Sequence, residues 1–160
     1  MTHVSVPFAP IKMTRRRRLA VQATLFGLWL TGLLWLPLHY FLVQKTRFGT
    51  APHPLEPWML KAHGAFAFAA LWTGGLLWGM HIVGGWRSGR RRWSGIAISA
   101  AGVLLIASGW LLYYAGDEDL RAVTSVAHWA IGVVSPVAFL LHRFARKRSA
   151  LRNLARSAAE

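Results

Sequence analysis

Four long runs of apolar residues limit the possible folds of this chain more than any other feature of its sequence. The runs cover residues 19–43, 58–83, 93–115 and 123–144. Only Lys61 and Arg143, close to run ends, carry a charge within them. A helix of about 20 residues crosses the roughly 30 Å hydrocarbon core of a bilayer, where it must satisfy its own backbone hydrogen bonds. We therefore predict an all-α fold, a four-helix transmembrane bundle that occupies residues 19–145.

The segments outside this bundle are short and basic. Residues 1–18 form a basic N-terminal tail and residues 146–160 a basic C-terminal tail. The arginines at positions 15–18 also fit the start of a secretory signal. The run that follows them is long for a signal core and lacks a clear small-residue cleavage pattern, so we interpret it as a membrane helix.

The distribution of Lys and Arg predicts the orientation of the bundle. All of these residues except Lys45, Arg47, Lys61 and Arg121 lie in the N-terminal tail, between the second and third runs, or from Arg143 onward. These three regions fall on one side of a four-helix protein, and basic residues are retained on the cytoplasmic side. We predict a multi-pass protein of a bacterial-type inner (plasma) membrane, with both termini cytoplasmic.

The net charge of +14 is also typical of proteins that bind nucleic acid. Here the basic residues flank membrane spans, where topology and attraction to anionic lipid headgroups account for them. We therefore expect lipid headgroups as partners and no nucleic acid.

The chain contains no cysteine. This excludes c-type haem attachment, iron–sulfur clusters, thiolate metal sites and disulfides. A redox cofactor would have to be held by other side chains, of which histidine is the candidate.

Four of the seven histidines lie inside the runs, where ionisable groups are costly and usually functional. His63 and His81 in the second run are five helical turns apart and share one face; His128 and His142 in the fourth run nearly do so. Both helices run inward, so depth pairs His63 with His128 on the outer side and His81 with His142 on the inner side. Such pairs predict axial ligands for haem iron.

Small residues follow the same faces and would leave room for a flat macrocycle. They are Ala67, Ala70 and Gly74 in the second run and Gly132, Ser135 and Ala138 in the fourth. In the third run, Gly95, Gly102, Gly109 and Gly116 recur every seven residues, which we interpret as a close-packing edge.

Two haem-free alternatives remain open at this point. In a membrane scaffold or assembly protein, the histidines would hydrogen-bond between helices. In a transporter or proton relay they would titrate, although few other polar groups lie within the runs. His39, near the outer end of the first run, is a candidate outer ligand or quinone contact, but we favour an interfacial histidine beside Tyr40.

The order of these motifs resembles a known family. The residues that carry the resemblance are His63-Gly64, Trp78, His81, Trp86-Arg87, Ser108-Gly109-Trp110, His128-Trp129, Gly132 and His142. Over about residues 20–145 the chain is similar to four-helix membrane b-type cytochromes, most of all the flavinylation-associated cytochromes. It is more distantly similar to the cytochrome b subunits of formate dehydrogenases and hydrogenases.

The resemblance implies electron transfer across the membrane through bis-histidine haem b, with two haems expected and one as the alternative. It implies a quinol or cytoplasmic donor, a membrane quinone pool, and an extracytoplasmic flavoprotein, cytochrome or oxidoreductase as partner. The related dehydrogenase subunits take one cytoplasmic-side ligand from their first helix. This chain has no histidine there, which favours His81 instead. We expect a subunit of a redox complex more than an independent catalyst.

Overall fold

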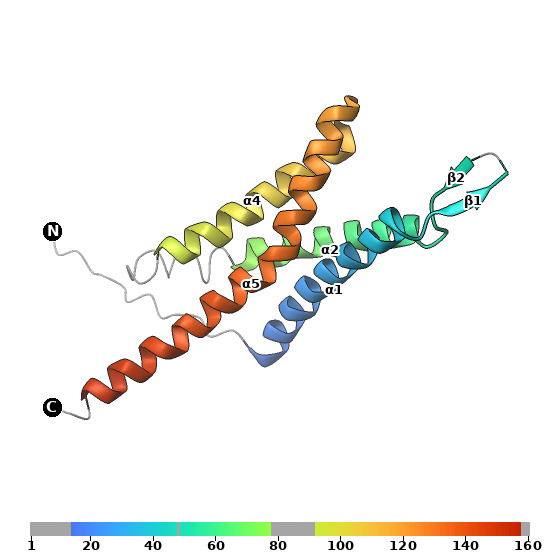
Figure 1. Cartoon of the computed structure of the whole chain (residues 1–160). Coiled ribbons are helices and arrows are strands. Elements are labelled where there is room, and N and C mark those ends of the chain that lie inside the picture. Colours follow the sequence, from blue (N-terminus) through green and yellow to red (C-terminus); the bar gives the residue numbers. More distant parts are fainter. Residues whose placement is uncertain (1–13, 48, 78–91, 158–160) are drawn as a thin grey trace, which may run out of the picture. The chain divides into compact units, whose positions relative to one another are not determined.

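The computed structural model describes residues 14–47, 49–77 and 92–157 of the chain, with side chains at 14–47, 49–75 and 95–141. The chain divides into two compact units, Met1–Arg90 and Arg91–Glu160, and each is described by itself (Figure 1).

The first unit is a pair of helices joined by a small β-hairpin. Helix α1 (Arg15–Tyr40) packs against α2 (Glu56–Leu77). Contacts pair Gly27 with Phe66, and Thr31 with His63. The residue number of the partner on α2 therefore decreases as the residue number on α1 increases, so the two helices are antiparallel.

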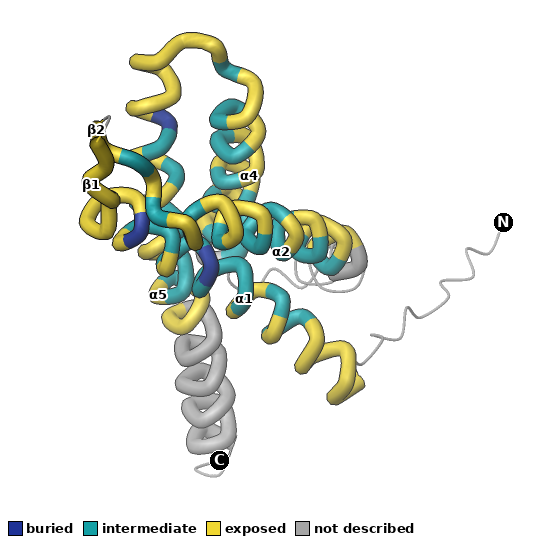
Figure 2. The backbone as a smooth tube through the Cα atoms, turned by 90° about the vertical axis from the view of Figure 1, so that its right-hand side faces the viewer, coloured by how far each residue is buried: buried dark blue, intermediate teal, exposed yellow. Residues whose placement is uncertain are grey.

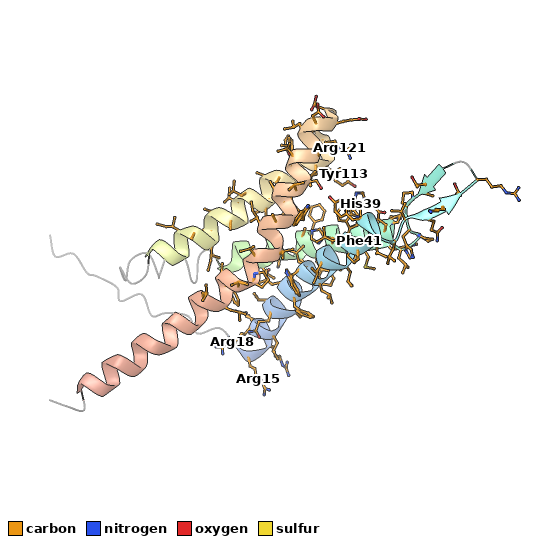
Figure 3. The ribbon with its side chains drawn as sticks, viewed as in Figure 1. Arg15, Arg18, His39, Phe41, Tyr113 and Arg121 are labelled. Atoms are coloured by element: carbon orange, nitrogen blue, oxygen red, sulfur yellow. The ribbon has the colours of Figure 1, made fainter. Side chains whose placement is uncertain are left out.

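Local chemistry sets the ends of α1. Oγ1 of Thr14 accepts a hydrogen bond from the backbone N–H of Arg17 at 3.4 Å, which caps the first turn. At the other end the backbone N–H groups of Phe41 and Leu42 both donate to the carbonyl of Pro37. Arg15 and Arg18 thus lie at one end of this helix and His39 at the other (Figure 3).

The hairpin between α1 and α2 was not predicted from the sequence. Strands β1 (Gln44–Thr46) and β2 (Gly49–Ala51) pair antiparallel. Gly49 adopts a φ of 119°, which L side chains rarely reach, and Oγ1 of Thr46 donates to its carbonyl at 2.7 Å. The backbone freedom of Gly49 and its hydrogen bond with Thr46, rather than an apolar pattern, therefore explain the hairpin.

The second unit is a helical hairpin. Helix α4 (Arg92–Tyr114) packs against α5 (Glu118–Ser157), which begins where Oδ1 of Asp117 accepts from the N–H of Leu120 at 2.7 Å. Tyr113 and Arg121 lie near this turn (Figure 3). The helix continues through Pro136 and includes most of the predicted C-terminal tail.

Three of these helices are long and apolar enough to cross a membrane, which is the signature of a membrane protein. They are Arg15–Tyr40, Gly95–Tyr114 and Glu118–Leu141. The prediction of a mainly helical chain is thus confirmed for the described residues. The second predicted run continues beyond the end of α2 into residues outside the described part, so a fourth span stays a prediction.

Few described residues are buried, as Figure 2 shows along both units. They are Thr31, Leu38 and Thr124. Large apolar side chains are instead exposed, among them Phe68 at 77% and Trp72 at 73%. Exposed apolar surface of this extent is suited to contact with lipid or with other apolar surfaces.

Candidate functional site

In the first unit, His63 of α2 is bound to α1 through its Nδ1 atom. This nitrogen lies 2.9 Å from the carbonyl oxygen of Leu28 and 3.3 Å from Oγ1 of Thr31. A carbonyl oxygen can only accept, so Nδ1 carries the proton and donates to Leu28. In the neutral imidazole the lone pair then lies on Nε2.

Glycines of α1 make room for these contacts. A Cβ atom at Gly32 would lie 2.9 Å from Cε1 of His63, and one at Gly27 would lie 2.5 Å from the ring of Phe66. Both distances are too short for carbon atoms in van der Waals contact. The imidazole of His63 therefore lies directly against the backbone of α1 at Gly32.

In the second unit, His128 of α5 makes a similar contact with α4. Its Nδ1 atom lies 2.8 Å from Oγ of Ser108. The same hydroxyl also lies 2.6 Å from the carbonyl oxygen of Leu104 and 3.2 Å from that of Leu105. A hydroxyl can donate or accept, so the direction of its bond to His128 depends on the tautomer of the ring.

A glycine again follows the hydroxyl residue. A Cβ at Gly109 would lie 3.4 Å from Cε1 of His128, at the short end of ordinary contact. Among the described residues, a Cβ at Gly95, Gly102 or Gly116 would meet nothing within 4 Å. The expected close-packing edge of the third run is therefore tight at Gly109, where α4 meets the histidine.

The two units thus contain the same local arrangement. A hydroxyl residue followed by glycine, Thr31-Gly32 or Ser108-Gly109, faces a histidine on the antiparallel helix. Each hydroxyl also donates to a carbonyl of its own helix, from Thr31 to Gly27 at 2.7 Å in the first unit. The sequence alone shows no convincing repeat.

A metal-ligating histidine usually donates its second ring N–H to a carbonyl or another acceptor, which fixes the tautomer and the ring orientation. The Nδ1 atoms of His63 and His128 are each hydrogen-bonded within their own helix pair, which leaves the prediction that these histidines bind haem iron untested. An apolar hollow on α5 is lined by Ala122, Val123, Val126 and Ala127, and His128 is not among its lining residues.

The other two predicted ligands are not placed. His81 lies outside the described residues, and His142 lies in α5 where side chains are not described. Of the predicted small residues, Gly74 is open, since a Cβ there would meet nothing within 4 Å. Ser135 donates to the carbonyl of Gly132 at 2.8 Å.

His39 has a partner that sequence analysis missed. Its Nδ1 lies 2.7 Å from Oε1 of Glu56, its ring stacks on Trp35 at 4.3 Å, and it meets Tyr40 edge-on at 4.8 Å. The side chain of Glu56 is 15% exposed and that of His39 is 43% exposed. Nε1 of Trp35 is buried without a hydrogen-bond partner among the described residues. The Glu56 contact depends on how the connector folds back, which a sequence pattern does not indicate.

Within the described part of the chain, no group of three or more His, Asp or Glu side chains could hold a metal ion. A haem iron with two axial histidines needs no such group. No family model, curated protein or solved structure matches the chain.

Proposed function

We propose that this chain is a four-helix membrane b-type cytochrome that transfers electrons across a bacterial-type inner membrane. His63 and His128 would be the axial ligands of an outer haem b, and His81 with His142 those of an inner one. This pairing follows from helix direction and depth in the sequence.

One observation supports the proposal: on each helix pair, a histidine at a predicted ligand position is hydrogen-bonded through Nδ1 to the neighbouring helix, beside a glycine. Metal-ligating histidines usually have such a bond on their other ring nitrogen, which orients the ring.

A haem iron with two imidazole ligands takes up and releases one electron and has no open site for substrate. The protein itself would hold both imidazoles and keep water away from the haem. Helices α1, α4 and α5 are apolar enough to exclude water. The chain would thus be the electron-transfer subunit of a larger redox complex.

The pair of His39 and Glu56 is the best place in the first unit for a quinol. Nδ1 of His39 would donate to the carboxylate of Glu56, which leaves Nε2 to accept from a quinol hydroxyl. The stacked ring of Trp35 offers an apolar wall for the quinone ring. An extracytoplasmic flavoprotein, cytochrome or oxidoreductase would be the alternative redox partner at this outer face, with the other electron carrier on the cytoplasmic side. Anionic headgroups would contact the basic tails.

The test is an optical spectrum of the full-length chain, purified in detergent after expression with sufficient haem. The dithionite-reduced minus oxidised spectrum should show a b-type α-band, and the pyridine haemochrome should count about two haems per chain. One haem per chain would retain the function and leave a single histidine pair to be identified.

Histidine variants locate the haem. His63→Ala and His128→Ala should each remove the same haem and leave any inner haem in place. His53→Ala is the matched control, because this connector histidine accepts from the N–H of Leu55 at 3.2 Å and lies outside the predicted spans. Control and ligand variants should therefore differ in haem content at equal protein yield.

A haem-free scaffold is the second candidate, and the hydrogen bonds of His63 and His128 within each helix pair are what favour it. It predicts a wild-type protein that binds no haem even under haem-replete expression. That result would overturn the cytochrome proposal.

A further inference from the structure

We propose that the connector between α1 and α2 docks on anionic lipid headgroups of the membrane leaflet next to it. The docking surface consists of residues 41–55, which contain the β-hairpin, together with Trp58 and Lys61 at the start of α2. It is separate from the basic tails. The inference goes beyond the proposed function, because it needs a chain that crosses a membrane but no haem.

Exposed apolar side chains lie at the base of this surface. The connector directly follows the candidate membrane span Arg15–Tyr40, and Figure 3 shows Phe41 where α1 meets the hairpin. Phe41 is 82% exposed, Leu42 is also exposed, and Trp58 across the connector is 63% exposed. Aromatic side chains at the end of a span are typical of the boundary between hydrocarbon and headgroups. This base is therefore suited to lie within the membrane interface.

The charge of the connector is entirely positive. Residues 41–55 contain Lys45 and Arg47 and no acid, and Glu56 is the only acidic residue of the chain before Asp117. Oε1 of Glu56 lies 2.7 Å from Nδ1 of His39, which directs this carboxylate toward α1. The positive charge next to an apolar base thus complements an anionic surface, and anionic lipid attracts such basic segments.

Lys61 and Trp58 show how the charge and the apolar base combine. Nζ of Lys61 lies 4.7 Å from the centre of the Trp58 ring, and both residues are exposed. A lysine in this position can keep its alkyl chain beside apolar groups while its ammonium group reaches the headgroups. The pair therefore has the chemistry of a residue couple at a membrane interface.

The hairpin itself has little support from the rest of the first unit. Strand β1 is exposed along its whole length, and in β2 only Ala51 is partly covered. A two-stranded hairpin alone in water is marginally stable at best, so contact with a membrane surface would stabilise it. An acidic soluble protein would also complement Lys45 and Arg47, but the exposed Phe41 and Leu42 beside a span end favour lipid.

The experiment uses the absence of cysteine, which lets a single introduced cysteine carry a spin label. Val43→Cys reports on the base of the hairpin and keeps Phe41 and Leu42 intact. Phe68→Cys on α2 is the reference for a label in lipid, and Asp119→Cys in the first turn of α5 is the reference for a label in water. The full-length variants are reconstituted in phosphatidylcholine vesicles that contain increasing fractions of phosphatidylglycerol. Collisions of each label with a water-soluble nickel chelate are measured by electron paramagnetic resonance.

We expect phosphatidylglycerol to protect the Val43 label from the nickel chelate. When Lys45→Gln and Arg47→Gln are combined, the lipid fraction that gives half of this protection should rise about fivefold for each charge removed. Lys45→Arg combined with Arg47→Lys is the matched control, since it retains both charges and both long side chains. This control should behave as the unsubstituted connector does.

A Val43 label that stays as exposed to the nickel chelate as the Asp119 label in every vesicle overturns the proposal and favours an acidic soluble partner. Protection that does not depend on phosphatidylglycerol, or that is equal in the neutral and charge-retaining variants, overturns the role of anionic headgroups. Because the measurement needs no haem, either result leaves the cytochrome proposal to its own optical test.

Discussion

The two helix pairs bind the Nδ1 atom of a histidine through different groups. In the first unit the nearest oxygen is a backbone carbonyl, that of Leu28, whereas in the second it is a side-chain hydroxyl, that of Ser108. The connectors also differ, since residues 41–55 contain a β-hairpin and residues 115–117 form a short turn. What the units share is therefore a hydrogen bond from Nδ1 to an oxygen of the neighbouring helix, beside a glycine, and this can arise from dissimilar sequences.

The units also differ in how closely the histidine approaches the opposite backbone. The missing Cβ of Gly32 would be 2.9 Å from the ring of His63, but that of Gly109 would be 3.4 Å from the ring of His128. The first site has no room for a methyl group, while the second has room for one at ordinary contact distance. This difference predicts opposite responses to the same substitution.

The largest expected effect is that of Gly32→Ala. Overpacking at this position should cost about 1–3 kcal/mol, which outweighs the roughly 1 kcal/mol gained when alanine replaces a helical glycine. His63 must move away, so its bond to Leu28 lengthens and haem binding falls. At Gly109, alanine should leave stability unchanged or slightly raised. Thermal unfolding in detergent and haem content per chain measure both effects.

Gly64→Ala is the control for helix propensity alone, because a Cβ there would meet nothing within 4 Å. Equal effects of Gly32→Ala and Gly109→Ala would contradict the closer approach of the histidine ring to the opposite helix in the first unit. The comparison between the two sites would then lose its basis.

The sequence predicts the helical part of this arrangement well. Long apolar runs locate α1, α4 and α5, because crossing a bilayer requires a length and hydrophobicity that are visible in a single sequence. The positions of His63 and His128 inside predicted spans mark them as candidates, because ionisable groups there are costly and usually functional. Ser108-Gly109 belongs to the residues that carry the resemblance to b-type cytochromes, but the sequence indicates only a close helix contact for Gly109.

The remaining features depend on contacts between distant residues. Thr31 meets His63 only because α1 and α2 pack closely at Gly32, and His39 meets Glu56 only because the connector returns the chain to the end of α1. Neither contact has a local pattern. The β-hairpin is likewise too short and too exposed to produce an apolar alternation.

A smaller effect is expected at the starts of the helices, where the units again differ. Asp117 caps α5 with a 2.7 Å bond to the N–H of Leu120, while Thr14 caps α1 with a 3.4 Å bond to the N–H of Arg17. Asp117→Ala should therefore destabilise the protein by about 1 kcal/mol, and Thr14→Ala by less. The two are compared by thermal unfolding at one detergent concentration. A larger loss for Thr14→Ala would reverse the ranking of the two caps.

The smallest expected effect on stability is that of neutralising an acid in the first turn of a helix. The two acids compared are Glu56 of α2 and Glu118 of α5. Glu56→Gln keeps an oxygen for Nδ1 of His39 but removes the charge, and because His39 is 43% exposed the cost in stability should stay below about 1 kcal/mol. Glu118→Gln loses only a favourable interaction with the helix dipole, about 0.3–1 kcal/mol. Similar stability in both variants, with slower reduction by quinol in Glu56→Gln alone, is the expected result. Equal rates of reduction would remove His39 and Glu56 as the quinol site and leave their contact a local link between α1 and α2.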